Sequence, residues 1–209
     1  MTADWDLFIE SLDGGNREWA NSLDTTALTN LQGQEREDAI QLLLARLSTG
    51  SARISRALGL LPDPRVVKAL ELHLPVARGA DRVATASSLL QLGSPQRQQA
   101  LTAIAQGLAE PDLVVASEAL KAAAEQAGVA VLHPLIATAV THPIENIRVG
   151  AIKTALFVSG VTDSPLGWTY RTEIVGLVRG TPDVQRQSFD VLCGLMKVDL
   201  TTYTGPRPR

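Results

Sequence analysis

The chain has 209 residues, enough for one domain or one short repeat array, and 45% of them are apolar, as in folded globular proteins. Its net charge of −3 argues against a general nucleic-acid binder, which would carry an excess of basic residues. Aromatic residues make up only 4%, and no alternation of polar and apolar residues extends beyond a few positions. This composition favours helices packed on helices over a β-sandwich or barrel, so we expect an all-α fold.

Cysteine usage and the first residues of the sequence bear on the cellular compartment. Cys193 is the only cysteine, so no intramolecular disulfide can form and an oxidising compartment is not implied. The sequence begins MTADWD, without the basic and apolar regions of a signal peptide, and no apolar run reaches the length of a membrane span. We therefore expect a cytoplasmic protein that makes no use of a membrane.

Residues 1–33 are predicted to form an N-terminal cap of two helices. Asp4 to Leu12 carries its apolar residues at helical spacing, and Asn16 to Leu31 can form the second helix. Residues 1–48 hold nine acidic and three basic residues, a net charge of −6, whereas the rest of the chain has a net charge of +3. Trp5 and Trp19 lie among these acids, so the cap is either an ordinary helical core with a solvated face or an acidic patch with aromatic anchors for a basic partner.

A repeat follows the cap along the chain. Similar stretches begin at Leu58 and Leu90, where Pro64 and Pro95 are 31 residues apart, and a third begins after Gly128 at a similar step. A fixed period of this size is typical of stacked helical hairpins. We place five hairpins, at residues 35–62, 63–93, 94–127, 128–160 and 165–198, and predict a disordered tail over residues 201–209.

Each hairpin is predicted to contain a polar turn between its first and second helix. The turns around Asp81, Asp112, Glu145 and Asp183 place an acid, with a nearby proline in the last three, where the second helix begins. Several second helices are predicted to end at a glycine in the left-handed conformation, namely Gly93, Gly128 and Gly160.

Three groups of residues match a known helical repeat. They are the start Asp63-Pro64-Arg65-Val66-Val67-Lys68-Ala69-Leu70 and the helix cores Asp81/Val83/Ala86/Leu89 and Pro143/Ile147/Arg148/Ala151/Leu156. With these residues the chain resembles the HEAT-repeat family over residues 35–198. The resemblance implies a right-handed α-solenoid of five HEAT-like helical hairpins with an N-terminal helical cap, in a single domain over residues 1–200.

The last hairpin carries a second resemblance. Trp168-Thr169-Tyr170-Arg171, followed by a hairpin that ends in Leu192-Cys193-Gly194-Leu195, looks like a pattern in HEAT-like proteins encoded beside bacterial toxin genes, where they serve as immunity proteins. This resemblance implies a non-enzymatic protein that binds a cognate bacterial toxin or effector and occludes its active site. It implies a monomer or a 1:1 complex with that partner.

The sequence contains no catalytic or metal-binding motif. His73, His133 and His142 lack the spacing that places two metal ligands on one helix face. Cys193 lies in an apolar stretch, which favours an inert buried thiol over a nucleophile. Neither a phosphate-binding loop nor a Gly-x-Ser-x-Gly stretch is present, so we predict no enzymatic activity, no metal and no cofactor.

Three alternatives remain open within the HEAT-like class. The first is a general scaffold or assembly factor, which would bind a housekeeping protein more weakly than an immunity protein binds a toxin. The second is a DNA glycosylase, although the net charge lacks the required basic excess. The third is a lyase that transfers bilin chromophores, an alternative that no particular residue supports.

In HEAT arrays the second helices of the hairpins line the concave surface, so their outward polar residues are the predicted partner-binding residues. The acids of the cap are added to this set because they suit a basic partner. The mixture of signs fits a protein surface better than a nucleic acid. The predicted partner-binding residues are Arg82, Asp112, Glu118, Glu125, Glu145, Arg148, Lys153, Asp183, Arg186, Asp190, Asp4 and Asp6.

Overall fold

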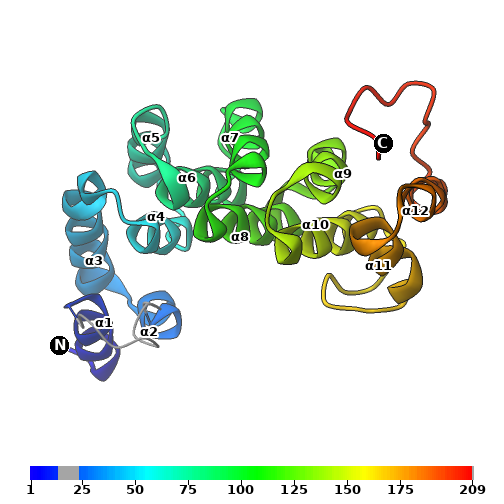
Figure 1. The fold of residues 1–209 in the computed structure, drawn as a ribbon. Helices are drawn as coiled ribbons and strands as arrows, with labels where there is room; N and C mark the ends of the chain where they lie inside the picture. The colour runs from blue at the N-terminus through cyan, green and yellow to red at the C-terminus, as the bar shows by residue number, and fades with distance from the viewer. Residues whose placement is uncertain (14–23, 209) are drawn as a thin grey trace. The chain divides into compact units, whose positions relative to one another are not determined.

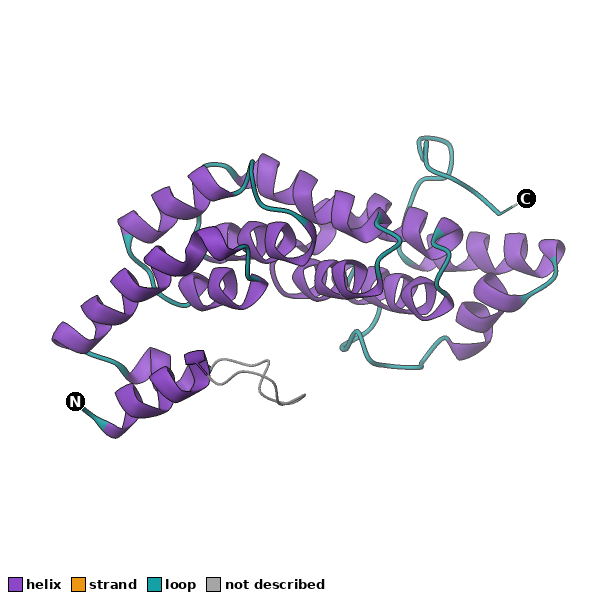
Figure 2. Cartoon of the chain, turned by 60° about the vertical axis from the view of Figure 1, so that its left-hand side comes forward, coloured by secondary structure: helices purple, strands orange, loops and turns teal. Residues whose placement is uncertain are grey.

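The computed structural model of the protein describes residues 1–13 and 24–208, and these residues form helices and loops without a strand (Figure 2). The predicted all-α class is therefore confirmed for this part of the chain. The predicted helix from Asn16 to Leu31 is present as α2 (Thr25–Asn30), while Trp19 and the rest of residues 14–23 lie outside the described residues. The chain divides into two compact units, Met1–Ala100 and Leu101–Arg209.

The first unit consists of the N-terminal helix followed along the chain by helices that pack on one another in pairs. Its helices are α1 (Ala3–Asp13), α2 (Thr25–Asn30), α3 (Gly33–Arg46), a 3-10 turn (Leu47–Thr49), α4 (Ala52–Gly59), α5 (Pro64–His73) and α6 (Gly79–Gln91). Helix α1 packs on α2, α3 packs on α4 and α5, and α6 packs on α4 and α5 (Figure 1). Fully buried side chains hold these contacts together, among them Phe8, Leu28, Ile40, Leu58, Leu70 and Leu89.

The start of α5 follows the capping chemistry that its sequence predicts. Pro64 occupies the first turn, and the Asp63 carboxylate accepts a hydrogen bond from the backbone N–H of Arg65 at 2.8 Å. The buried stripe of this helix begins at Val66, which is fully buried, whereas Val67 is only half-buried. Val66 leads the stripe because it shares one helix face with Leu70, four residues later.

The second unit continues with helix pairs. Helix α7 (Arg97–Ala109) crosses the boundary between the units, and it is followed by α8 (Leu113–Ala122), a π turn (Ala123–Ala127), a 3-10 turn (Gly128–Val131), α9 (Leu132–Thr141), α10 (Glu145–Val158), α11 (Arg171–Arg179) and α12 (Pro182–Leu195). Helix α10 packs on α8, α9 and α11, and α11 packs on α12. Each of the five predicted hairpins thus contains two α-helices. Gly93 and Gly160 have the predicted positive φ, whereas Gly128, with φ 57° and ψ −143°, lies outside the predicted left-handed helical conformation.

One helical stretch, Leu113–Thr141, is long and apolar enough to cross a membrane by length and composition alone. The stretch is not one straight helix, because Gly128 has φ 57° and ψ −143° and separates α8 from α9. A helix of the core passes the same test of length and composition, so this stretch is weak support for a membrane span.

Two helix pairs come close together where a glycine faces a serine. A Cβ atom on Gly59 of α4 would lie 2.8 Å from Cβ and 3.2 Å from Cα of Ser88 in α6. A Cβ atom on Gly176 of α11 would lie 3.3 Å from Val184 and closer still to the hydroxyl of Ser188 in α12. The separation of α4 and α6 therefore depends on the missing side chain of Gly59, whereas the nearest atom to Gly176 is a hydroxyl that can rotate.

The segment after α12 is packed at one point, although the sequence predicts a disordered tail. Tyr203 is 5% exposed, and its ring lies 5.4 Å from the ring of His133 and 6.0 Å from that of Phe189. Such aromatic contacts compensate part of the chain entropy that ordering a tail costs. Composition rich in Gly and Pro predicted flexibility here, but it carried no information about this aromatic partner.

Candidate functional site

The predicted partner-binding residues lie in both units. Asp4, Asp6 and Arg82 belong to the first unit, and the other nine belong to the second. Those with exposed side chains are Asp6, Asp112, Glu125, Asp183, Arg186 and Asp190. The half-buried ones are Asp4, Arg82, Glu118, Glu145 and Arg148, and Lys153 is buried.

Several of these residues already have a structural role. The Asp112 carboxylate caps α8 by accepting hydrogen bonds from the backbone N–H groups of Val114 and Val115, at 2.9 and 3.0 Å. The Arg148 guanidinium donates to the backbone carbonyls of His142 and Val178, at 3.5 and 3.3 Å. Asp112 and Arg148 thus stabilise helix ends and helix contacts in the fold, whatever they contribute to a partner.

Lys153 differs most from the sequence-based expectation. Its side chain is only 9% exposed, and its Nζ donates a hydrogen bond of 2.8 Å to the backbone carbonyl of Leu166. The same Nζ lies 4.3 Å from the centre of the Trp168 ring, within cation–π distance. Burial lowers the pKa of this lysine because it disfavours the charged form. Lys153 therefore fixes the loop between α10 and α11 instead of reaching solvent.

This loop, residues 159–170, presents large apolar side chains to solvent. It lies to one side of the helices in Figure 1, between α10 and α11. Leu166 is 79% exposed and Trp168 is 50% exposed, although Lys153 holds the backbone of one and the ring of the other. The sequence predicts Trp168 within the last hairpin, but Lys153, the buried lysine beside its ring, lies 15 residues away on α10.

Two hollows open beside this loop along α11. One has a volume of about 460 Å³ and is lined by Val149, Trp168, Arg171, Val175, Val178 and Arg179. The other has a volume of about 500 Å³ and is lined by Arg171, Thr172, Val175, Gly176, Arg179, Gly180 and Val184. We name the exposed loop residues Leu166 and Trp168, together with Arg171, Val175 and Arg179 of α11, the α11 surface. It combines apolar and cationic groups, as many protein-binding surfaces do.

The first unit contains a buried polar network that sequence analysis missed. The Asp81 carboxylate accepts a hydrogen bond of 2.6 Å from the Ser55 hydroxyl and lies 2.7 Å from Nε2 of His73. Thr85 donates to the same Ser55 hydroxyl, and Ser88 donates to the Ser55 carbonyl, at 3.1 and 2.8 Å. Because Asp81 stands between the serine and the histidine, the histidine does not activate the serine as a base would. The network ties α4, α5 and α6 together.

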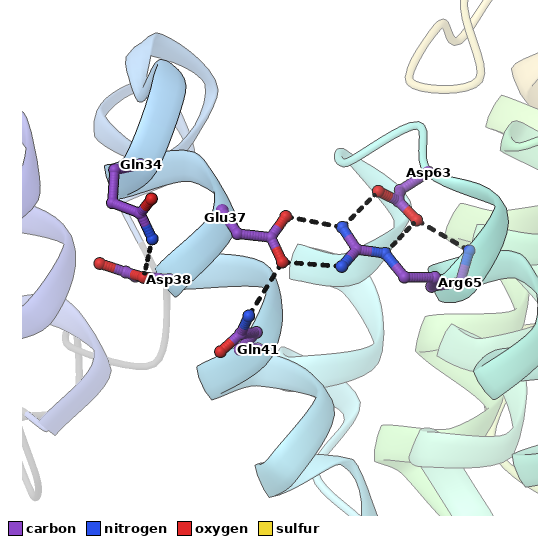
Figure 3. A network of polar contacts seen from close by, with 6 residues as sticks. All are labelled: Gln34, Glu37, Asp38, Gln41, Asp63 and Arg65. Carbon is purple, nitrogen blue, oxygen red and sulfur yellow. Dashed lines mark hydrogen bonds and ion pairs between the residues drawn. The ribbon is translucent and has the colours of Figure 1, made fainter.

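A second polar cluster of the first unit is exposed and joins α3 to the start of α5 (Figure 3). The Arg65 guanidinium donates two hydrogen bonds of 2.7 Å to Glu37 and two more, at 3.0 and 2.8 Å, to Asp63. These bonds lower the pKa of Glu37 and of Asp63 to about 2. Because Arg65 is paired with both Glu37 and Asp63, this cluster offers no unpaired cation to a partner.

Cys193 has the chemistry of a buried thiol. It is 1% exposed, and burial, helped by the negative charge of Asp190, raises its pKa to about 11. The thiolate is the reactive form of cysteine, so this residue is protonated and unreactive near neutral pH.

We expect Cys193 in the native protein to react with a thiol reagent such as DTNB far more slowly than in urea, when both are measured near pH 8. The unfolded thiol releases its proton near the ordinary pKa of 9.0, before the folded one does at about 11. Stability should therefore be unaffected by this group below that range and fall as pH rises through it. Rapid labelling of the native protein would contradict this description of the site.

No group of three or more His, Cys, Asp or Glu side chains in residues 1–13 and 24–208 is arranged to hold a metal ion. Comparison of the chain with protein families, with curated proteins and with solved structures found no match.

Proposed function

We propose that this chain is a non-enzymatic, HEAT-like solenoid that binds another protein, and that it acts as an immunity protein against a cognate bacterial toxin or effector. The observation that carries the proposal is the α11 surface, where Leu166 and Trp168 are exposed on a loop that Lys153 holds in place. Exposed apolar side chains on an ordered surface are typical of interaction sites, and Trp and Arg are common among the residues that dominate binding energy.

The ordered loop also favours tight binding. Because Lys153 fixes both the backbone and the tryptophan ring, little conformational entropy is lost when a partner covers them. The mechanism that we propose is steric: a partner seated on this surface has its active site covered, and no bond is made or broken by the chain. The pairs of helices in both units support the solenoid part of the proposal, since HEAT-like arrays are built from such hairpins.

The function is tested by co-expressing the chain with the product of the gene beside it and measuring growth, complex formation and stoichiometry. We expect protection from toxicity and a 1:1 complex on size exclusion. The double substitution Leu166→Asp and Trp168→Ala should weaken the complex by at least about tenfold, because an interface core tolerates neither a buried charge nor the loss of an aromatic anchor.

The matched control is Leu113→Asp, which places the same charge on another exposed leucine at the start of α8, where helix geometry favours an acid. This variant should bind and protect like the natural chain. A neighbouring gene product that is harmless and forms no complex would refute the immunity function, and equal binding by the loop variant would refute the site.

A further inference from the structure

The exposed side of α11 is a stripe of three residues. Arg171, Val175 and Arg179 follow one another at intervals of four, so they lie on one face of the helix, about 6 Å apart at each step. All three side chains are exposed, and all three line both hollows. An apolar residue therefore lies between two cations, with a hollow on each side.

This stripe is positively charged, and part of its hydrogen-bonding capacity is not taken up within the chain. Arginines are the only ionisable residues that line either hollow; Glu173 of the same helix lines neither. The Arg171 side chain makes no hydrogen bond or ion pair with any residue of the described chain. Arg179 donates to Glu145 through Nε and Nη2, which leaves its Nη1 group available to a second acceptor. The surface thus has capacity for additional carboxylates.

We infer that the α11 surface binds an acidic helix of the partner, on which two carboxylates flank a large apolar residue at intervals of four. This inference rests on the proposed protein-binding function and specifies the chemistry of the partner. Two helices that pack side by side have the same rise per residue, so Glu-x3-Leu-x3-Glu matches Arg171, Val175 and Arg179 in register. The hollows beside Val175 accept the leucine, and Trp168 covers it from the loop.

The acidic N-terminal cap led us to expect a basic partner from the sequence, and the α11 surface favours the opposite charge. The cap acids are countered in part by their own structural roles, since Asp4 and Asp6 lie in the first turn of α1, where the helix dipole favours acids. The positive charge of Arg171 on α11 is not balanced by any such interaction. Charge complementarity therefore favours an acidic segment at this surface.

The test uses three fluorescein-labelled, alanine-rich peptides of about 16 residues, a length at which such helices become stable. They carry Glu-x3-Leu-x3-Glu, Gln-x3-Leu-x3-Gln or Lys-x3-Leu-x3-Lys and are titrated with the full chain by fluorescence anisotropy. We expect the Glu peptide to bind most tightly, the Gln peptide about threefold more weakly and the Lys peptide most weakly. The advantage of the Glu peptide should shrink when salt is added.

Substitutions on α11 test the site directly. Arg171→Glu places an acid at a helix N-terminus, which the helix tolerates well, and it leaves one acid and one cation on the stripe, so it should abolish the preference for the Glu peptide over the Lys peptide. Val175→Ala should weaken all three peptides, since the apolar contact is common to them. The control Lys121→Gln removes one positive charge from an exposed position on α8 and should leave all three affinities unchanged. Circular dichroism confirms that each variant is folded.

Each outcome decides the inference. Equal or tighter binding of the Lys peptide by the natural chain, or no binding of any peptide, overturns the acidic-helix inference. An order of affinities that Arg171→Glu leaves unchanged overturns the site on α11. In each of these cases, complex formation with the neighbouring gene product still decides the proposed function separately.

Discussion

Replacing Asp81 by alanine should lower the free energy of unfolding of the full chain by about 3 kcal/mol, because it leaves a fully buried serine and a half-buried histidine without their acceptor. Asp81 is 3% exposed, and both its oxygens are used, one by the fully buried Ser55 and one by His73. Alanine can satisfy neither group, and Ser55 is fully buried in the natural chain. The change is measured by urea unfolding followed by circular dichroism.

Hydrogen exchange and two further substitutions locate the effect. Amide protection should fall first in α4 and α6, the helices that carry Ser55 and Asp81. Asp81→Asn keeps one oxygen acceptor and the shape of the side chain, so its cost should be smaller. Glu10→Ala, at an exposed position of α1, should leave the free energy of unfolding unchanged. If Asp81→Ala unfolded at the urea concentration of the natural chain, the network would have no part in stability.

Gly59→Ala should destabilise the chain by about 2 kcal/mol, although alanine is the better helix former. The new Cβ would lie 2.8 Å from Cβ and 3.2 Å from Cα of Ser88, so the backbones of α4 and α6 must move apart. That movement also strains the hydrogen bond from the Ser88 hydroxyl to the Ser55 carbonyl. Thermal and urea unfolding measure the loss.

A double-mutant cycle separates this clash from other effects of the substitution. Gly59→Ala combined with Ser88→Gly should be less damaging than the sum of the two single substitutions, with a coupling of about 1 kcal/mol. Gly194→Ala is the control of opposite sign, because a Cβ at this helical position meets nothing within 4 Å. It should stabilise the chain by about 0.5 kcal/mol. Equal losses at Gly59 and Gly194 would show that the close approach is unimportant.

Local chemistry predicted much of the fold. The α5 start at Asp63 and Pro64, the Asp112 cap and the positive φ of Gly160 all depend on residues within one helical turn of the feature itself. The pairs of helices were predicted for the same reason, since polar turns and apolar periodicity are both read over short windows.

Features that depend on distant residues were not predictable in this way. Asp81 was expected as an acid at a helix start, and its partners Ser55 and His73 come from two other helices. Lys153 was expected to face a partner. The groups that it contacts, the carbonyl of Leu166 and the ring of Trp168, are distant in sequence, and no residue near Lys153 indicates these contacts. A residue type fixes what a side chain can bind, but only the tertiary packing decides whether it meets solvent or protein.

The contact between Gly176 and Ser188 constrains which sequences can evolve on this fold. A Cβ atom at position 176 would overlap the Ser188 hydroxyl and lie 3.3 Å from Val184, so a larger residue there requires this hydroxyl to rotate away or a smaller residue at position 188. In homologues these two positions, 12 apart in the chain, should covary. The pair therefore links the choice of residue on α11 to the choice of residue on α12.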